Sequence, residues 1–292
     1  MHTVTLLAAP ARSDLTTERV DAIRDLFEGG HAIWLADRLA VEFPADRLPE
    51  DAVQIAEDTR RAGFDLVIQP TAGRRKSVLL ADMDSTMIQQ ECIDELAAEA
   101  GVGERVADIT ARAMNGELNF HEALIERVGL LAGLDEAVIG NVLDQRITLA
   151  PGGRELVATM RDQGAYTALV SGGFTAFTGP IARALGFDED RANTLLAADG
   201  VLTGRVALPV LGHAAKVEAL QEITAARGVS PAEAIVVGDG ANDLGMIQLA
   251  GTGVALHAKP VVAAQAPIRI NHGDLTALLY LQGYGRDEFV AA

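Results

Sequence analysis

Two carboxylates one residue apart follow a short apolar run in this chain. The sequence Asp82-Met83-Asp84-Ser85-Thr86 comes directly after the apolar run 78–81, which is typical of a buried parallel strand. Open α/β sheets bind ligands outside the carboxyl ends of their strands, so the two acids are candidates for a reaction centre. The alternative interpretation is a turn that caps the following helix.

Two further predicted strands end in polar, glycine-rich segments. One segment begins with Ser171 and Gly172, and the other contains Asp239. Right-handed crossovers would bring both segments to the sheet edge at which Asp82 lies. A fourth feature is Lys216, a lone cation near the start of a predicted helix. The topology therefore predicts that groups distant in sequence meet at one edge of the sheet.

Together these residue types suit phosphoryl transfer to a carboxylate. Asp82 can attack phosphorus and form an aspartyl-phosphate. A dianionic phosphate repels a bare carboxylate, and Mg²⁺ held by Asp82 and Asp239 would offset that repulsion. Lys216 supplies a second positive charge. Ser171 and the backbone N–H of Gly172 can hold phosphate oxygens, because a glycine turn lets the backbone approach closely.

The second carboxylate of the pair has a separate task. The leaving oxygen needs a proton, and the water that attacks later must lose one, so Asp84 is predicted to be the acid and base. Neighbouring negative charge favours its protonated form. Asp243 lies four residues after Asp239 and is predicted to orient the metal or its waters without contacting the substrate.

The elements that must position these residues follow an α/β pattern. Strand–helix alternation resumes near residue 151 and predicts a Rossmann-like parallel sheet. From about 88 to 148 the pattern is helical, which predicts a helical cap inserted over the strand ends. Asp199-Gly200 predicts a hairpin turn within 194–206.

Residues 1–72 carry a pattern of their own. Their order of predicted elements, βαββαβ, is that of a ferredoxin-like α+β module. It resembles the ACT-type regulatory modules, which bind small molecules and often amino acids. The alternative is a purely structural or dimerising domain, and a homodimer through this segment is the assembly that we expect. The polar, basic segment 71–76 is the predicted linker.

The chemical motifs resemble, in order, the four motifs of the haloacid dehalogenase-like phosphatases. They occupy 82–86, 171–174, Lys216 and 238–243. The Asp-x-Asp-Ser-Thr form of the first motif and the segment 91–95 are similar in particular to the phosphoserine phosphatases of that superfamily. The resemblance covers about residues 77–275 and implies a hydrolase core over 77–292.

The resemblance implies Mg²⁺-dependent hydrolysis through a phospho-aspartate, with O-phosphoserine as the small-molecule substrate. It implies Asp82 as the nucleophile and Asp84 as the acid and base. The implied metal ligands are Asp82, the backbone carbonyl of Asp84, and Asp239, with Asp243 nearby; the implied phosphate-binding residues are Ser171, Gly172, Lys216 and Asn242.

Recognition of the rest of the substrate falls to the predicted cap. Phosphoserine carries an ammonium and a carboxylate, which call for one fixed anion and one fixed cation. Glu91 and Arg127 match such positions in the family, and the fork of an arginine can bind both carboxylate oxygens. Met114 and Phe120 match positions that shield the site from water. Each assignment has an alternative: Glu91 could be a solvated acid at the start of a helix, and Arg127 could be a surface ion-pair partner. Met114 and Phe120 could be core side chains of the cap.

Composition limits the remaining function classes. The 292-residue chain has a formal net charge of −17, which argues against nucleic acid as a partner because such binding needs a basic surface. Cys92 is the single cysteine, so no disulfide can form within the chain. No segment has the ~20 apolar residues of a membrane helix. We therefore expect a cytoplasmic protein that does not bind membranes.

The predicted function is hydrolysis of O-phosphoserine to serine and phosphate, the last step of serine biosynthesis. The first alternative is a phosphatase or phosphotransferase for another small phosphorylated amino acid, such as phosphohomoserine or phosphothreonine. The second is a regulatory protein that senses amino acids through residues 1–72.

Overall fold

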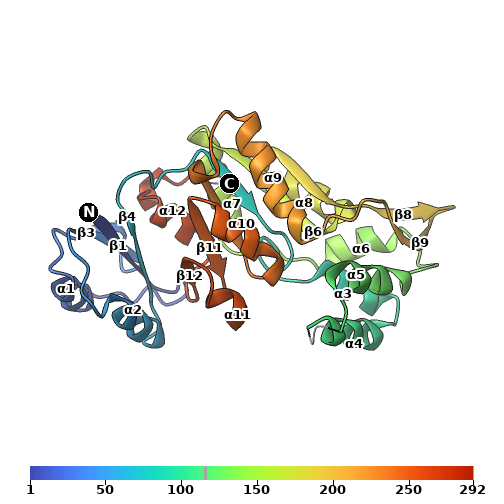
Figure 1. Cartoon of the computed structure of the whole chain (residues 1–292), viewed down its shortest axis with the longest axis horizontal. Helices are drawn as coiled ribbons and strands as arrows, with labels where there is room; N and C mark the ends of the chain where they lie inside the picture. The colour runs from blue at the N-terminus through green and yellow to red at the C-terminus, as the bar shows by residue number, and fades with distance from the viewer. Residues whose placement is uncertain (115–116, 292) are drawn as a thin grey trace.

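The structure is a computed structural model that describes residues 1–114 and 117–291. Three bodies lie in a row along the longest axis of the molecule (Figure 1). An N-terminal α+β unit occupies one end, a helical cap occupies the other, and a core with a parallel sheet lies between them. The predicted fold class is confirmed: an α/β core with a helical insert, preceded by a ferredoxin-like unit.

The N-terminal unit has the predicted βαββαβ order. Its four strands form one antiparallel sheet in the order β2-β3-β1-β4. Thr16 begins the first helix, because its side chain accepts a hydrogen bond from the backbone N–H of Arg19. The elements are β1 (His2–Leu7), α1 (Thr17–Leu26), β2 (Ile33–Ala36), β3 (Ala40–Ala45), α2 (Ala52–Arg61) and β4 (Asp65–Pro70).

The core is a six-stranded parallel sheet in the order β12-β11-β10-β5-β6-β7. The strand order reverses direction at β5, so a crevice opens outside the carboxyl ends of β5, β6 and β10. The elements are β5 (Val78–Ala81), α7 (Gly153–Asp162), β6 (Tyr166–Phe174), α8 (Thr175–Leu185), β7 (Glu189–Asn193), α9 (His213–Ala226), β10 (Ala234–Gly238), α10 (Leu244–Leu249), β11 (Thr252–Leu256), α11 (Pro260–Ala263), β12 (Ile268–Ile270) and α12 (Ala277–Leu281).

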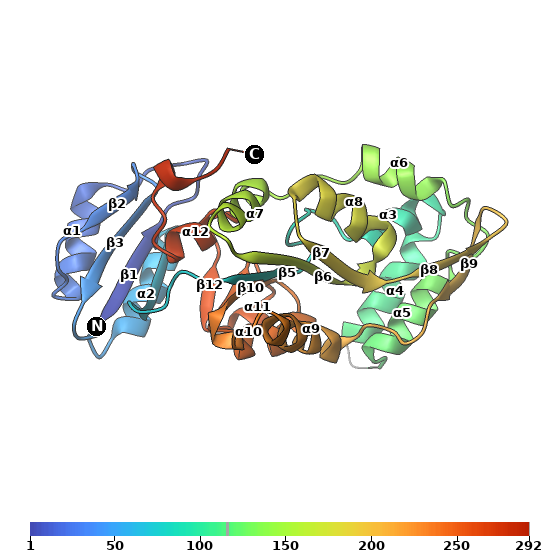
Figure 2. The same cartoon turned by 90° about the horizontal axis from the view of Figure 1, so that it is seen from above.

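Helices cover both faces of this sheet. α7, α8 and α12 lie on one side, and α9, α10 and α11 lie on the other (Figure 2). Because successive side chains of a strand point to opposite faces, β5 serves both layers. Leu79 and Ala81 pack in the first layer, whereas Val78 and Leu80 pack in the second. All four side chains are fully buried, which explains the continuous apolar run that marks this strand in the sequence.

The first part of the cap follows β5 and has four helices within the described residues. Asn119 and Glu122 form a capping box that fixes the start of the third helix. The helices are α3 (Cys92–Glu99), α4 (Gly103–Met114), α5 (Phe120–Gly129) and α6 (Val138–Gln145). These helices form the helical body at one end of the molecule (Figure 1).

A hairpin from a later part of the chain packs against this cap. It consists of β8 (Leu195–Ala198) and β9 (Val201–Val206), and it lies beside α5 in both views (Figures 1 and 2). The backbone N–H of Gly133 donates to the Leu202 carbonyl at 2.8 Å, and the Leu202 N–H donates to the Leu134 carbonyl at 2.8 Å. The sequence predicted the hairpin but not this position, so the cap is built from two separate excursions of the chain.

The N-terminal unit contacts the core through apolar and ionic groups. Leu7, Ala40 and Val67 belong to the same buried cluster as side chains of α12. Arg74 and Glu42 form a largely buried ion pair at 2.6 Å beside this cluster. Within the described residues, no helix has the length and apolar character needed to cross a membrane.

Candidate active site

The acid that follows β5 lies at the centre of a buried ionic cluster. The Asp82 carboxyl accepts a hydrogen bond from the Met83 N–H at 2.7 Å, and its other oxygen lies 2.7 Å from the Lys216 ammonium. Burial and the neighbouring Asp243 raise the pKa of Asp82, whereas Lys216 opposes that rise. The turn after β5 is therefore more than a helix cap, because its first acid contacts a residue 134 positions later in the sequence.

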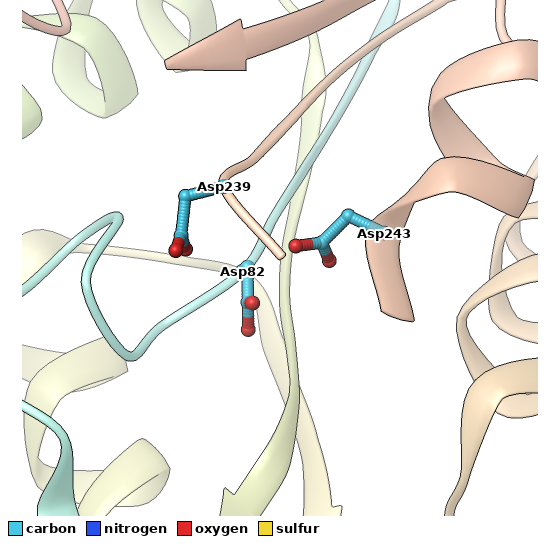
Figure 3. A group of neighbouring side chains, drawn as sticks. All are labelled: Asp82, Asp239 and Asp243. Atoms are coloured by element: carbon cyan, nitrogen blue, oxygen red, sulfur yellow. The ribbon is translucent and has the colours of Figure 1, made fainter. Parts of the chain in front are cut away.

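Three carboxyls converge at this point. Asp82, Asp239 and Asp243 each offer an oxygen, and these atoms lie within 4.8 Å of one another (Figure 3). Hydrogen bonds from the Thr86 hydroxyl to Asp239 at 3.0 Å and from the Gly240 N–H to Asp243 at 2.9 Å orient two of them. Such a group of buried oxygen ligands suits a hard divalent cation.

Burial raises the pKa of Asp239 above its ordinary value, and the neighbouring Asp243 adds to the effect. Two like charges that lie this close in a buried site disfavour each other, so the cluster holds more negative charge than its own cation offsets. A divalent cation would restore the balance and favour the ionised form of these carboxyls. The residues that are present therefore fit a metal of this class.

Lys216 links two members of this group from behind. Its ammonium lies 2.7 Å from Asp82 and 2.5 Å from Asp243, and its side chain is only 3% exposed. Burial by itself would lower the pKa of the ammonium, but the two carboxylates more than offset this, so the pKa is raised. The ammonium is therefore a fixed positive charge at the floor of the site.

The second acid of the first motif is held by two separate elements. One Asp84 oxygen accepts from the Cys92 N–H at 2.9 Å, at the start of α3, and the other accepts from the Ser171 hydroxyl at 3.3 Å, at the end of β6. Burial raises the pKa of Asp84, although these hydrogen bonds oppose the rise. Its carboxyl is not a member of the convergent group of three.

The glycine-containing end of β6, where the pairing with β7 shifts register between Val170 and Phe174, is called the glycine turn below, and it has no room for side chains. A Cβ at Gly173 would lie 2.6 Å from the Asp84 carboxyl and 3.0 Å from the Ser171 hydroxyl. The Gly173 N–H donates to Ser171 at 2.8 Å. Asn193, which ends β7, donates to the Gly172 carbonyl at 2.9 Å and so fixes the turn from the neighbouring strand.

One cavity of about 490 Å³ joins this floor to the cap. Glu91, Phe120 and Arg127 line it from the cap side, and Asn242 lines it from the core side. Lys216 and Asp243 are not among the residues that line it, because they lie behind Asp82. Met114 ends α4, and its side chain lies outside the described part of the structure.

The two charged cap residues are held differently. The Ser85 hydroxyl donates to Glu91 at 2.8 Å, and the Arg127 Nε donates to the Ala123 carbonyl at 3.2 Å. Burial and the nearby Asp84 raise the pKa of Glu91 to about 7. Burial lowers the pKa of Arg127, and it stays charged because its ordinary value is so high. One anion and one cation therefore face the same cavity.

Three residues that the sequence analysis did not single out belong to this site. Thr86 holds Asp239, Asn193 holds the glycine turn, and Lys259 lines the cavity from the segment before α11. Thr86 lies inside the first motif, so its position was a usable signal. Asn193 lies on the strand that the sequence analysis missed, and a single lysine in a loop carries no pattern.

Comparison with known proteins agrees with this arrangement. The family model of the haloacid dehalogenase-like hydrolases matches residues 79–248. A phosphoserine phosphatase of Streptomyces coelicolor is 40% identical over an alignment of 300 positions, which covers 99% of this chain and 72% of that protein.

Solved structures give the same result. A haloacid dehalogenase family hydrolase from Salmonella enterica serovar Typhi has a TM-score of 0.85 at 31% identity, covering 96% of this chain and 97% of that one. A phospho-aspartyl intermediate analogue of phosphoserine phosphatase has a TM-score of 0.66 at 41% identity, covering 70% of this chain and 98% of that one. The chain belongs to the haloacid dehalogenase-like hydrolase family.

Proposed function

We infer that this protein hydrolyses O-phosphoserine to serine and phosphate through an aspartyl-phosphate. The observation that carries this inference is the single cavity that connects Asp82 to both Glu91 and Arg127. Its floor has the carboxylates that phosphoryl transfer needs, with the Lys216 ammonium directly behind Asp82, and its roof has one carboxyl group and one cation for an amino acid. The phosphoserine phosphatases at 40–46% identity support the same substrate.

In the first step Asp82 attacks phosphorus. A bond forms between its carboxylate oxygen and phosphorus, and the bond from phosphorus to the serine oxygen breaks. The leaving oxygen takes its proton from Asp84, and burial, which raises the pKa of this carboxyl, favours its protonated form. Serine leaves with that proton, and the phosphoryl group stays on Asp82.

In the second step water attacks the same phosphorus. Asp84, now ionised, accepts the proton from the water, and the bond between phosphorus and Asp82 breaks. Phosphate is released, Asp82 is again a free carboxylate, and Asp84 is again protonated. The hydrogen bond from the Cys92 N–H keeps the Asp84 carboxyl in one orientation through both steps.

Phosphate recognition in this proposal falls to the glycine turn and the buried cation. Ser171 and the N–H of Gly172 donate to phosphate oxygens, and Asn242 adds an amide at the rim of the same cavity. Lys216 provides positive charge beside the nucleophile. These groups stabilise the charge that spreads over the transferring oxygens.

The metal would be Mg²⁺, held by Asp82, Asp239 and the backbone carbonyl of Asp84, with Asp243 supporting it from behind. When bound, it neutralises negative charge on the phosphate and on the nucleophile. Asp243 donates no proton here: it accepts hydrogen bonds from Lys216 and the Gly240 N–H, which hold it in place. The convergence of three carboxyl oxygens within 4.8 Å supports this assignment.

Substrate choice in this proposal rests on the cap. Glu91 pairs with the substrate ammonium and Arg127 with its carboxylate. The Phe120 ring would lie 3.1 Å from a Cβ placed at Gly172, so it covers the phosphate-binding glycine and excludes water there. Met114 is assigned the same role from sequence. These residues lie on or next to the cap helices: Glu91 directly precedes α3, Met114 ends α4, and Phe120 and Arg127 lie on α5.

The experiment is phosphate release by purified protein across a panel of phosphomonoesters, with Mg²⁺ and with chelator. We expect turnover of phosphoserine that requires Mg²⁺. Asp82→Asn should lower kcat by at least about a thousandfold, because it removes the nucleophile. Equal phosphate release from wild type and Asp82→Asn would overturn the proposal.

The same panel separates the alternative substrates. If phosphothreonine or phosphohomoserine has the higher kcat/KM, the substrate assignment changes while the chemistry stands. Arg127→Ala should lower kcat/KM by about a hundredfold on substrates with a carboxylate and much less on phosphomonoesters without one. A purely regulatory function has no observation in its favour, because the described residues include a complete set of candidate catalytic groups.

We also propose that residues 1–72 form an ACT-like domain that pairs two copies of the chain, in a cytoplasmic protein. The strand order supports the domain assignment, and Ile33 and Trp34 are 52% and 37% exposed on the edge strand β2. Light scattering after gel filtration tests the pairing. Trp34→Ser should shift a dimer toward monomer, and a wild-type monomer at all concentrations would refute it.

A further inference from the structure

Among the described residues that line the active-site cavity, Lys259 is the only one that is both charged and exposed, so it marks the mouth of the cavity. Among the residues that line the cavity, three are exposed: Ala241, Lys259 and Val261. They come from the two segments that follow β10 and β11, so this part of the core forms the rim. Lys259 is therefore the first charged group of the lining that an approaching ligand meets.

The backbone of Lys259 is anchored, whereas its ammonium is free. Its N–H donates to the Asp239 carbonyl at 3.3 Å, and Pro260 begins α11 directly after it. Among the described residues, its ammonium has no carboxylate within 4.0 Å and no hydrogen-bond partner. A long flexible side chain with a fixed base and an unpaired charge can follow a ligand from solvent into the cavity.

The surroundings of this cation repel anions. Four carboxyl groups line the cavity, from Asp82, Asp84, Glu91 and Asp239, and the cations of the lining are Arg127 and Lys259. The whole chain has a net charge of −17. Charges beyond about 8 Å are screened at physiological salt, so the groups at the mouth decide whether an anion enters.

Lys259 interacts electrostatically with three carboxyl groups near the mouth. The positive charge of Lys259 opposes the rise in pKa of Glu91, Asp94 and Asp239, which belong to the cap and to the core. Lys216 cannot supply this attraction at the entrance, because it is 3% exposed and already paired with two carboxylates. The chain therefore has one cation for the floor and another for the entrance.

We propose that Lys259 is a capture residue, which attracts the phosphate of the incoming substrate to the cavity mouth and guides it toward Asp82. This inference rests on the proposed function for the identity of the substrate. Lys259 takes no part in breaking the bond to phosphorus, because the groups assigned to that step lie on the cavity floor. Its loss should therefore lower kcat/KM and leave kcat nearly unchanged.

The experiment compares wild type with Lys259→Gln, Lys259→Arg and Arg227→Gln over a series of salt concentrations. Arg227 is a matched control: it is exposed, it packs on Tyr166 at the opposite end of β6, and its replacement changes the net charge equally. At low salt Lys259→Gln should lower kcat/KM for phosphoserine about fivefold, with kcat within about twofold of wild type. Lys259→Arg should keep most of the wild-type value.

Salt dependence decides between capture and other roles. Wild type, Lys259→Arg and Arg227→Gln should lose kcat/KM as salt rises, and Lys259→Gln should lose much less, because the attraction is already absent. An equal fall in kcat and kcat/KM for Lys259→Gln, an unchanged salt slope, or the same loss in Arg227→Gln would each overturn the proposal.

A binding measurement separates this inference from the proposed function. Titration calorimetry with inorganic phosphate and Mg²⁺ needs no turnover, and Lys259→Gln should weaken phosphate binding severalfold at low salt. If wild type fails to hydrolyse phosphoserine, the proposed function fails, and the calorimetric result still decides the role of Lys259. Equal binding by wild type and Lys259→Gln would refute capture under either outcome.

Discussion

The Asp84 carboxyl depends on two parts of the chain that meet only in the folded protein. The Cys92 N–H comes from the cap and the Ser171 hydroxyl comes from the core. The orientation of the acid therefore reports on whether cap and core are correctly joined. A change as small as one methyl group beside it should be visible in the chemistry.

Gly173→Ala tests this dependence at the residue scale. The added Cβ would lie 2.6 Å from the Asp84 carboxyl, so that carboxyl or the turn must move. We expect kcat for phosphoserine to fall by about 10²-fold, because a displaced acid no longer reaches the leaving oxygen. Steady-state kinetics measures the loss, and the unfolding midpoint shows whether the fold is retained.

Gly179→Ala is the matched control, because the same methyl group inside α8 meets its nearest atom at an ordinary distance of 3.5 Å. We expect kcat within about twofold of wild type and equal or slightly higher stability, since alanine favours a helix by up to about 1 kcal/mol. Equal effects from both substitutions would contradict the role given to the turn.

The pH dependence of substrate binding should depend on Glu91. Its pKa is raised to about 7, so the carboxyl is mostly neutral at pH 6 and mostly ionised at pH 8. The ionised form attracts the substrate ammonium, so kcat/KM should gain from this group as pH rises. Glu91→Gln removes this gain, and the ratio of wild-type to mutant kcat/KM should rise about tenfold from about pH 6 to 8.

The ratio is the informative quantity, because the substrate phosphate also titrates near pH 6 and affects both proteins equally. A ratio that stays flat over this range would contradict the assignment of Glu91 to the ammonium. A ratio that falls with rising pH would mean that the neutral form is the one that binds.

At the residue scale the sequence predicted most of the groups that lie within motifs, although not Thr86, and it missed Asn193 and Lys259, which lie outside them. Asp82, Asp84 and Ser171 stand where strand ends must lie, so topology alone brings them together. Their catalytic roles stay predictions. Asn193 and Lys259 reach the site through contacts between elements, and a single sequence does not encode which loop neighbours which.

At the scale of elements, the hairpin β8–β9 supports the cap helix that carries Arg127. Gly204 lies in the left-handed region at φ +72, and a Cβ there would lie 2.8 Å from the Ala132 Cβ and 3.2 Å from the Gly129 carbonyl, which ends α5. The close approach of the hairpin to α5 therefore requires a glycine at this position.

Gly204→Ala should weaken substrate binding from a distance. The strained backbone and the close contact should cost about 1–3 kcal/mol of stability and shift the end of α5. We expect KM for phosphoserine to rise severalfold with a smaller change in kcat, because Arg127 moves while the core is untouched. Thermal unfolding and steady-state kinetics measure both effects.

Gly140→Ala provides the comparison within the same cap. Gly140 is exposed inside α6, and no atom lies within 4 Å of a Cβ there. This substitution should raise stability by about 0.5–1 kcal/mol and leave KM unchanged. If Gly204→Ala behaves in the same way, the hairpin does not position the cap.

The sequence predicted most elements and missed one strand. β7 has the sequence Glu189–Asn193 and forms the edge of the sheet, so it pairs with β6 only and carries charged side chains. Neither alternation nor an apolar run marks such a strand. The central strand β5, by contrast, is apolar at every position because both faces are covered.

At the scale of the whole molecule, one buried acid fastens the N-terminal unit to the core. Asp65 is 1% exposed and begins β4. Its carboxyl accepts hydrogen bonds from the backbone N–H groups of Asn271, His272 and Gly273, at 2.8–2.9 Å, in the loop after β12. Both oxygens of this carboxylate therefore accept hydrogen bonds from the loop.

Asp65→Asn should loosen this attachment. One carboxylate oxygen becomes an amide that cannot accept, so N–H groups of the loop lose their partner, at a cost of about 2–4 kcal/mol. We expect a lower urea midpoint and faster proteolysis within the linker 71–76, with kcat within about twofold because β11 and β10 separate β12 from β5, which carries the nucleophile.

Asp58→Asn is the control for charge and for the choice of domain. Asp58 forms an exposed i,i+3 pair with Arg61 on α2, and such pairs contribute at most about 1 kcal/mol. A proteolysis rate for Asp65→Asn that matches Asp58→Asn would contradict the fastening role. The domain boundaries at 72 and 77 stay predictions until this measurement locates the accessible linker.

The two-part cap has a consequence for exchanging substrate range between relatives. A transplant of residues 88–148 alone would place foreign helices against the native hairpin 195–206, and the bonds between Gly133, Leu202 and Leu134 would have to form across unmatched surfaces. Chimeras should therefore keep activity only when both segments come from the same donor. Substrate specificity in this architecture therefore depends on two segments together, which are distant in sequence and in contact in the folded protein.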